Sequence, residues 1–260
     1  MATRRLTPRE AARRWPAQAF ATDVLLQPDA GWVRAADGLG ALRAGARAAG
    51  ADLRHGLPVG RIEPVAGGVR VTAGDDVVTA PVAVVTAGAW TADLLTSVGA
   101  PPLPHLTTTE EHVFFLEPRT GVAPDRLPSF IHWEGTAHYG LATPDGRVKV
   151  GEHHSGTVTT ADERSDGPDP ARVARIERYA REWLPGLAPA VVAATTCLYT
   201  TTPTHDFVLD RVGPVVVATG FSGHGFKFVP EIGRRLAAMA LDGEPARPPF
   251  TLAAHAAAAR

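Results

Sequence analysis

The chain has 260 residues, of which 45% are hydrophobic, and a formal net charge of −1. This composition can bury the core of one large domain or two small ones, and the near-neutral charge argues against nucleic acid, which requires a basic stripe. No apolar run reaches the roughly 18 residues of a membrane span, and no apolar segment follows the N-terminal arginines as in a signal peptide. The single cysteine, Cys197, excludes an internal disulfide and is typical of a reducing compartment. We therefore expect a cytoplasmic protein with no nucleic-acid or membrane partner.

The N-terminal part begins with a clear helix signal. Thr7 to Glu10 place threonine before proline and glutamate, the pattern of a capping box with proline at the first helical position. A short strand is expected at residues 22–26. A second helix is expected over residues 32–49, which are rich in Ala, Leu and Arg, and Gly50 suits the position after its end.

Signals for β-structure dominate from residue 51 to residue 86. Residues 51–80 carry alternating or β-branched segments separated by Gly-containing turns. The continuous apolar run at residues 82–86 is typical of a strand buried on both faces. It ends in a turn at residues 87–90, which leads into a helix. The proline-rich residues 101–104 indicate a switch between domains.

The rest of the chain predicts an antiparallel sheet followed by a return to α/β structure. Short strands recur from residue 105 to residue 156, and a helix with proline near its start covers residues 168–183. The apolar residues 215–219 indicate a second buried strand. A Gly-rich turn at residues 220–227 and a last helix at residues 228–241 follow it. The chain is thus α/β at both ends, with a mostly β insertion.

The chain has only two lysines, Lys149 and Lys227, against twenty-four arginines. Where arginine replaces lysine so widely, a retained lysine indicates a task for a compact ammonium with a movable pKa, which a planar guanidinium does not offer. Lys149 lies in a strand-like run and Lys227 in the Gly-rich turn, so neither resembles part of a solvated charged face. Chance placement is the alternative explanation.

The Gly-rich turn at residues 220–228 is the strongest candidate for a ligand site. In doubly wound sheets, ligands lie at the carboxyl ends of strands, against helix N-termini, and glycines allow backbone amides to approach them closely. Three glycines, a serine, a histidine and a lysine fall within this turn. The alternative is a structural turn in which Ser222 and His224 only shape the backbone.

Other motifs fail on spacing. The G-x-S-x-G elbow of hydrolases requires glycine where His224 stands, and Gly38-Leu39-Gly40 has neither a preceding strand nor a third glycine for dinucleotide binding. Glu110-Glu111-His112 and Glu152-His153-His154 contain metal-ligand residue types. Adjacent residues on a strand point to opposite faces, however, so no metal site is expected.

Four segments, in one order, resemble the monomeric sarcosine oxidase and N-methyltryptophan oxidase family, which belongs to the D-amino-acid-oxidase-like FAD-dependent oxidoreductases. The turn at residues 220–228 is similar to the family signature, and residues 84–90 to the strand and turn beside the flavin. Residues 149–153 resemble the strand that carries the oxygen-activating lysine, and residues 197–210 the segment with the flavin-linked cysteine. Nearly the whole chain can be aligned in this way, and both lysines and the cysteine then fall on functional positions.

The resemblance implies an α/β plus α+β fold class. The chain would contain an incomplete FAD-binding doubly wound domain and an inserted, mostly antiparallel-sheet substrate domain. The FAD-binding domain would comprise residues 31–104 and 204–245, and the substrate domain residues 1–30 and 105–203. Residues 246–260 would form a loose tail.

The resemblance also implies how the chain would hold FAD. Cys197 would bond through its sulfur to the 8α-methyl of the isoalloxazine, which makes the flavin covalent; a buried structural thiol is the alternative. The other cofactor-binding residues would come from the two turns that follow the buried strands: Gly88, Ala89, Trp90, Gly223, His224, Gly225, Phe226 and Lys227.

Four residues would carry the chemistry that the resemblance implies. Lys149 would lie over flavin N5 and favour electron transfer to O2, and Lys227 would hold the substrate carboxylate. Tyr139 and His153 would line the pocket near the amine, with a packed core histidine as the alternative for His153. Fixed cations suit both an anionic reduced flavin and a carboxylate. The reaction would oxidise a small secondary amino acid, such as sarcosine, to an imine, with O2 reduced to hydrogen peroxide.

One part of the family pattern has no counterpart in this sequence. The family opens with a strand, a G-x-G-x-x-G turn, a helix and an acidic residue about twenty positions later, which hold the FAD pyrophosphate and ribose. Met1 aligns where the family is already well under way. A truncated or misassigned start, a separate chain that supplies this unit, and a flavin-free remnant that only binds a small molecule or a subunit are the three explanations. By itself, the chain given would have an exposed strand edge.

Overall fold

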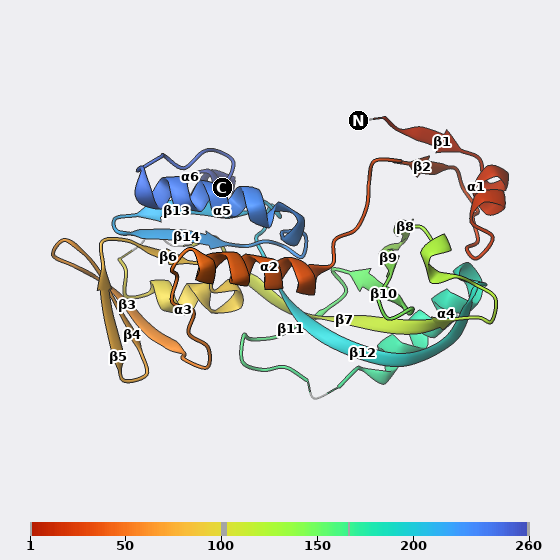
Figure 1. Ribbon diagram of the computed structural model, residues 1–260, viewed down its shortest axis with the longest axis horizontal. Helices are drawn as coiled ribbons and strands as arrows, with labels where there is room; N and C mark the ends of the chain where they lie inside the picture. Colours follow the sequence, from red (N-terminus) through yellow and green to blue (C-terminus); the bar gives the residue numbers. More distant parts are fainter. Residues whose placement is uncertain (1, 100–102, 166, 259–260) are drawn as a thin grey trace. The chain divides into compact units, whose positions relative to one another are not determined.

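The computed structural model describes residues 2–99, 103–165 and 167–258. These residues form two compact units, built from segments that alternate along the chain (Figure 1). Unit 1 comprises Met1–Trp32, Glu110–Thr157 and Glu163–Cys197, and unit 2 comprises Val33–Thr109, Val158–Asp162 and Leu198–Arg260. Among the described residues, no helix is both long and apolar enough to cross a bilayer.

Unit 1 consists mainly of one antiparallel sheet and the helix that covers it. Its elements are β1 (Arg4–Leu6), α1 (Pro8–Arg14), β2 (Val24–Leu26), most of β7 (Thr107–Pro118), the 3-10 turn η2 (Pro124–Arg126), β8 (Phe130–Glu134), β9 (Thr136–Ala142), β10 (Val148–His153), the start of β11 (Thr157–Val158), α4 (Pro170–Trp183) and most of β12 (Leu187–Thr201).

Helix α1 confirms the capping box read from the sequence. The Glu10 backbone N–H donates to the Thr7 hydroxyl at 3.3 Å, and Glu10 Oε2 accepts from the Thr7 backbone N–H at 2.8 Å. These two bonds satisfy donors that a helix start otherwise leaves free. The predicted strand before the second helix is also present, as β2, which pairs with β1.

The large sheet of unit 1 has the strand order β11-β7-β10-β9-β8, and β12 also pairs with β7. Side chains alternate across a strand, so Phe114 and Leu116 of β7 and Val148 and Val150 of β10 share one face. That face packs against the apolar side of α4, and Figure 1 shows α4 alongside the sheet. Each of the four side chains is at most 1% exposed. The core thereby fixes which residues of β10 face the other way.

Unit 2 combines a small sheet, a meander and several helices. Its elements are α2 (Ala35–Ala48), β3 (Val59–Val65), β4 (Gly68–Ala73), β5 (Asp76–Ala80), β6 (Ala83–Val85), the 3-10 turn η1 (Gly88–Trp90), α3 (Thr91–Leu95), β13 (Val208–Val212), β14 (Val215–Thr219), the 3-10 turn η3 (Phe226–Phe228), α5 (Val229–Leu241) and α6 (Leu252–Ala258).

Strand β14 is the centre of unit 2. It pairs antiparallel with β13 and parallel with β6, and all five of its residues are buried. Val215 and Val217 pack with α3, β3 and β4 on one face, while Val216 and Ala218 pack with α5 on the other. Figure 1 shows α5 lying along the small sheet, and Leu252 of α6 packs with the first cluster. The prediction of a strand buried on both faces is confirmed for residues 215–219.

The same prediction is wrong for residues 82–86. Strand β6 is an edge strand whose ladder partner, among the described residues, is β14, and its Val84 is 44% exposed. Helix α2 likewise has no buried residue, and its Leu39 and Leu42 are 42% and 48% exposed. An apolar run in the sequence indicates a strand, but it does not show whether a neighbouring strand covers that strand.

The expected loose tail at residues 246–260 is also corrected by the structure. Helix α6 forms there, and its Leu252 and His255 are 5% and 4% exposed. The Leu252 backbone N–H donates to Asp210 at 2.8 Å, and His255 Nε2 donates to the Phe207 carbonyl at 3.1 Å. The alanine-rich sequence gave little amphipathic signal, so its two anchoring side chains were missed.

Candidate functional site

Three of the sequence-predicted site residues share the sheet face of unit 1 that points away from α4. Lys149 and His153 lie on β10, on the opposite side from the buried Val148 and Val150. Tyr139 of β9 is directly opposite Gly151 in the antiparallel register, between the rows of Lys149 and His153. The alternation of β10 therefore presents an ammonium, a phenol and an imidazole on one surface, which we call the front face.

A glycine allows these side chains to approach one another. A Cβ at Gly151 would lie 2.7 Å from Cζ and from Oη of Tyr139, so only glycine leaves room for that ring. Lys149 Nζ lies 5.7 Å from the centroid of the same ring, within reach of a cation–π contact. The His153 and His154 rings follow at a centroid separation of 4.1 Å. The front face thus brings polar side chains together around Gly151.

The opposite face of the same strands holds a buried polar network. Arg175 of α4 donates to both carboxylate oxygens of Glu152, at 3.1 and 2.6 Å, and His138 Nε2 lies 3.6 Å from Glu152 Oε1. Burial alone would raise the pKa of Glu152, but the hydrogen bonds from His138 and Arg175 outweigh it and lower the pKa to about 2. Tyr179 stacks on His138 at 3.9 Å. This network fastens the sheet to α4, behind the front face.

Cys197 lies near the end of β12, the strand that pairs with β7. Burial raises the pKa of its thiol, the negative charge of Glu111 raises it further, and Lys149 opposes the shift. Glu111 is 1% exposed and accepts a hydrogen bond from the Ser155 backbone N–H at 3.2 Å. Lys149, Glu111 and Cys197 therefore form one electrostatic neighbourhood, in which the neutral thiol is favoured over the thiolate.

In unit 2, the two predicted turns lie at the same edge of the small sheet. Because β6 and β14 are parallel, their carboxyl ends meet there, which is where doubly wound sheets bind ligands. The Thr219 hydroxyl donates to the Gly88 carbonyl at 3.3 Å and so links the two turns. Gly88 has φ +55°, and Trp90 Nε1 donates to Asp162 at 2.8 Å. The structure thus brings the Gly88–Trp90 turn next to the end of β14.

The Gly-rich turn after β14 depends on positive φ angles. Gly220 and Gly223 have φ +67° and +75°, and the fully buried Ser222 has φ +48°. The Ser222 backbone N–H donates to the Thr200 carbonyl at 3.0 Å. A Cβ at Gly223 would lie 2.1 Å from Cε2 of Tyr199, so the backbone lies against that ring. The hydrogen bonds that Ser222 donates are to the backbone of the turn and of β12, as in the alternative interpretation in which this residue shapes the turn.

Lys227 and His224 are tied to this turn in the structure. Lys227 Nζ donates to the His224 carbonyl at 2.8 Å and lies 5.3 Å from the centroid of the Phe228 ring. His224 Nδ1 donates to the Ser222 carbonyl at 2.8 Å. The Lys227 side chain is exposed. Its ammonium is therefore at the surface of the turn, held by one carbonyl.

The two acidic-histidine motifs do not form metal clusters. Glu152 and His153 lie on opposite faces of β10, as strand alternation requires. Glu110 accepts hydrogen bonds from the backbone and hydroxyl of Ser165, and Glu111 points to Ser155. Within the part of the chain that the structure describes, no group of three potential ligands is placed to hold a metal ion.

The predicted site residues fall into one group in each unit. Tyr139, Lys149, His153 and Cys197 belong to unit 1, and residues 88–90 and 223–227 to unit 2. Their functional roles stay predictions.

The sequence gave no sign of the residues that shape each group. Beyond the effect of burial, Glu111 raises the pKa of Cys197, the Tyr199 ring lies against Gly223, and Asp162 accepts a hydrogen bond from Trp90. Each of these contacts joins segments that are distant in sequence.

Unit 2 thus has a mixed three-stranded sheet with the predicted turns at the carboxyl ends of its two parallel strands, and unit 1 has an antiparallel sheet that bears the Lys149 ammonium. Residues 1–239 match the family model described as FAD dependent oxidoreductase. The chain belongs to this family. The chain is 34% identical over 258 residues to the monomeric sarcosine oxidase of Streptomyces avermitilis, covering 94% of this chain and 66% of the relative.

Three further proteins are similar to this chain. The N-methyl-L-tryptophan oxidase of Salmonella arizonae is 29% identical over 234 residues, covering 85% of this chain and 60% of the relative. A solved structure of NikD, an amino acid oxidase essential for nikkomycin biosynthesis, has a TM-score of 0.79 and 27% identity, covering 95% of this chain and 67% of that one. A glycine oxidase from Geobacillus kaustophilus shares the fold at a TM-score of 0.80 and 22% identity, covering 96% of this chain and 66% of that one. The predicted resemblance and the α/β plus α+β fold class are confirmed, and the chain spans 60–66% of the length of these two curated relatives.

We expect alkylation of Cys197 by iodoacetamide to require a higher pH in the native chain than in urea. The folded thiol has a raised pKa, so the reactive thiolate forms only as the pH rises past the value for the unfolded thiol. Glu111→Gln removes a negative charge and should lower the pH midpoint of the alkylation rate. The exposed Glu117→Gln on the same strand is the matched control. Equal midpoints for the native and unfolded chains would contradict the assignment.

Gly223→Ala should lower the stability of unit 2 by about 1–3 kcal/mol, because alanine at this φ is strained and its Cβ meets the Tyr199 ring. Gly233→Ala in α5 is the control, since no atom lies within 4 Å of its Cβ position and alanine favours a helix over glycine by up to ~1 kcal/mol. Urea unfolding followed by circular dichroism measures both changes. A Gly223→Ala midpoint at or above that of the parent chain would show that the turn adopts another backbone.

Proposed function

We propose that this chain serves in the FAD-dependent oxidation of a secondary amine, in an N-methyl amino acid or a similar small carboxylate, to an imine. The amine would lose two electrons and two protons, and O2 would be reduced to hydrogen peroxide. The observation that carries the proposal is the front face of unit 1. One of only two lysines of the chain lies there beside Tyr139 and His153, with Cys197 in its electrostatic neighbourhood.

Each unit, taken by itself, offers features that suit the ring end of FAD. On the front face, Gly151 leaves room for the Tyr139 ring, and Lys149 carries a positive charge that suits an anionic reduced ring. The turns after β6 and β14 supply a glycine-lined edge. For the pyrophosphate end, the sequence has no G-x-G-x-x-G turn. The fit is therefore to the isoalloxazine and not to the whole dinucleotide.

Each residue has a physical task in this proposal. Bound FAD would accept a hydride from the amine and pass the electrons to O2. Lys149 would stabilise the negative charge that develops when the reduced cofactor passes electrons to O2, because a cation already fixed in place needs no reorganisation. Lys227 would bind the substrate carboxylate, and Tyr139 and His153 would orient the amine. Cys197 would supply the sulfur of a thioether to the flavin 8α-methyl; the S–H and one methyl C–H would be lost with two electrons, which O2 would finally accept as it forms hydrogen peroxide.

The front face also supports a substrate with an apolar substituent. Ile131 of β8 is opposite Tyr139, and Trp133 is opposite Ala137, which in turn is opposite His153. Both large side chains are exposed, by 70% and 75%. They extend the polar surface around Gly151 with an apolar one on the same face. We propose that an N-methyl amino acid with an aromatic or branched side chain fits this surface better than sarcosine.

A further polypeptide segment is part of the proposal, in the form of a separate strand–turn–helix chain. The open edge of β6, with Val84 44% exposed, is suited to one more parallel strand. In the same unit, α2 leaves Leu39 and Leu42 half exposed. Parallel sheets are normally covered on both faces. Such a segment, carrying a G-x-G-x-x-G turn, would bring the helix N-terminus that binds the pyrophosphate.

The proposed location is the cytoplasm. The single cysteine is free in the structure, and free thiols persist in reducing compartments.

The test is to co-express the full chain with a strand–turn–helix fragment that carries G-x-G-x-x-G and to record the flavin absorbance of the purified material. We expect flavin binding that depends on the fragment, and anaerobic bleaching of the flavin by N-methyltryptophan faster than by sarcosine. After acid precipitation the pellet should stay yellow, and Cys197→Ser should release the flavin into the supernatant.

Three outcomes separate the parts of this proposal. Flavin binding without bleaching by any N-methyl amino acid would indicate a non-catalytic binding protein. A colourless pellet from an active protein would remove only the covalent link. Absence of flavin with and without the fragment would overturn the proposed function.

Lys149→Met should slow oxidation of the reduced flavin by O2 by about 10²–10³-fold, the usual loss when a preorganised charge is removed. Flavin reduction by the amine should change much less, because the charge acts in the other half-reaction. Stopped-flow absorbance measures both rates separately. Lys149→Arg retains the charge and should recover part of the rate. Arg181→Met, at an exposed position of α4, controls for the loss of a remote cation. Equal slowing of both half-reactions would contradict the role of Lys149.

A further inference from the structure

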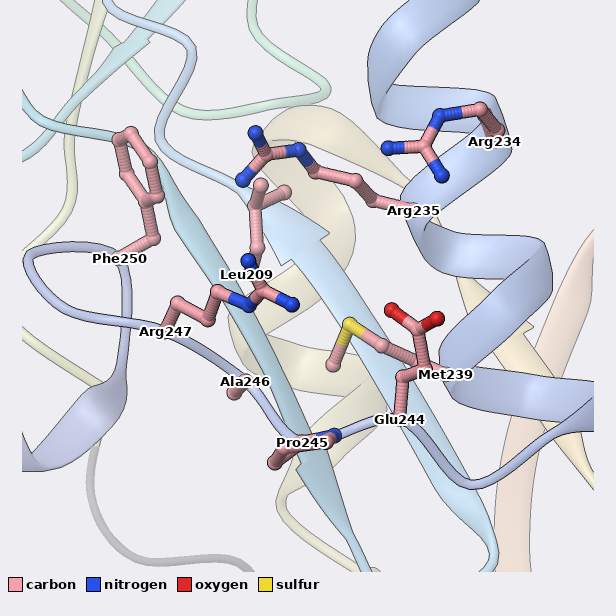
Figure 2. Close-up of a pocket in the computed structure, with 9 residues that line it drawn as sticks. All are labelled: Leu209, Arg234, Arg235, Met239, Glu244, Pro245, Ala246, Arg247 and Phe250. Carbon is pink, nitrogen blue, oxygen red and sulfur yellow. The ribbon is translucent and has the colours of Figure 1, made fainter.

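Unit 2 contains a pocket that shares no lining residue with either predicted turn. Its volume is about 160 Å³, and it lies between α5 and the loop at residues 244–250. Leu209, Met239 and Phe250 provide apolar surface, and the lining also includes three arginines: Arg234, Arg235 and Arg247. In Figure 2, the Arg235 side chain enters from α5 and the Arg247 side chain from the loop, with Leu209 between them. The volume is well above the roughly 10–15 Å³ that a single water molecule needs.

The walls of this pocket are held in place by the fold. The Leu209 backbone N–H donates to the Phe250 carbonyl at 2.8 Å, and the Phe250 N–H donates to the Arg247 carbonyl at 3.1 Å. The Phe250 ring stacks on Phe207 at a centroid distance of 6.1 Å. Met239 is 4% exposed within the core under α5. The loop is thereby fastened to β13, and the pocket does not depend on a ligand for its shape.

The charges in the pocket are unbalanced. Glu231 accepts from Arg234 at 2.9 and 3.0 Å and from Arg235 at 2.7 Å, so this carboxylate is already shared by two guanidinium groups. Glu244 is the one acidic residue of the lining. Among the residues that the structure describes, the Arg247 guanidinium has no hydrogen-bond or ion-pair partner. Positive charge therefore exceeds negative charge around an apolar floor.

We propose that this pocket binds a small organic carboxylate with an aromatic or branched apolar body. A carboxylate matches the fork geometry of a guanidinium and can accept two parallel hydrogen bonds from Arg247. The apolar body would lie against Leu209, Met239 and Phe250. None of the residues that line the pocket belongs to the front face or to the two ligand turns, so we expect binding at this pocket to require no flavin.

The proposal is tested with the full chain, by isothermal titration of benzoate at low salt. Uncharged benzamide and inorganic phosphate serve as probes that lack the charge and the apolar body. We expect benzoate to bind more tightly than either. Arg247→Gln and Arg235→Gln should each weaken benzoate binding at least tenfold, while Arg247→Lys should recover only part of it. Arg43→Gln on α2 removes the same charge elsewhere and should leave the affinity unchanged, and circular dichroism checks the fold of each variant.

Several results would overturn the proposal. Benzoate binding that survives Arg247→Gln but is lost in Lys227→Ala would place the ligand at the Gly-rich turn. Equal weakening by Arg43→Gln would show that only the overall charge matters. Phosphate binding as tight as benzoate would remove the apolar part of the site. If about 10 mM benzoate gave no measurable heat, the dissociation constant would be on the order of millimolar or weaker. That result would mean that the pocket is not a carboxylate site.

Discussion

The two-residue alternation of β10 is the constraint on which the candidate site depends. Val148 and Val150 are at most 1% exposed in the core against α4, so Lys149, Gly151 and His153 have to face the other way. A slip of one residue would place the Lys149 ammonium in that core, where an unpaired charge costs several kcal/mol. The hydrophobic core of unit 1 thus determines the direction of the functional side chains, and the Glu152–Arg175 pair anchors the same strand from behind.

Elements with a local signal could be predicted from the sequence. The Thr7 capping box, the buried β14 and the helix after the Gly-rich turn depend on neighbouring residues, and the structure confirms all three. The scarcity of lysine also singled out Lys149. The predictions that were wrong concern features that depend on residues far apart in the chain. Whether the apolar β6 run is covered is decided by which strands are present beside it, and the helix at the C-terminus is held by Asp210, a residue 42 positions away from Leu252.

The environment of Cys197 shows why residue types alone do not define a site. A free cysteine in a strand is compatible with flavin attachment or with simple packing. In the structure, burial and Glu111 disfavour the thiolate, while Lys149 favours it. The thiolate is the nucleophile, so attachment of the flavin would depend on the balance between one carboxylate and one ammonium. The lysine would then have two functions at the same face, one toward the sulfur and one toward the ring.

The open edge of unit 2 has an energetic consequence for any separate segment that covers it. Val84 at this edge, and Leu39 and Leu42 on α2 of the same unit, are each about half exposed. Burial of all three by such a segment would contribute at most about 2–4 kcal/mol in total, given about 1.5–3 kcal/mol for each fully buried side chain. Association of two chains costs about 4–15 kcal/mol in lost freedom. Apolar contact at this edge is therefore insufficient by itself, and the strand ladder and the contacts to FAD have to supply the rest. Because β14 is already covered on both faces, the segment would add to a formed sheet and would not complete its core. Docking of such a segment and binding of the cofactor are then coupled, since each provides free energy that the other lacks.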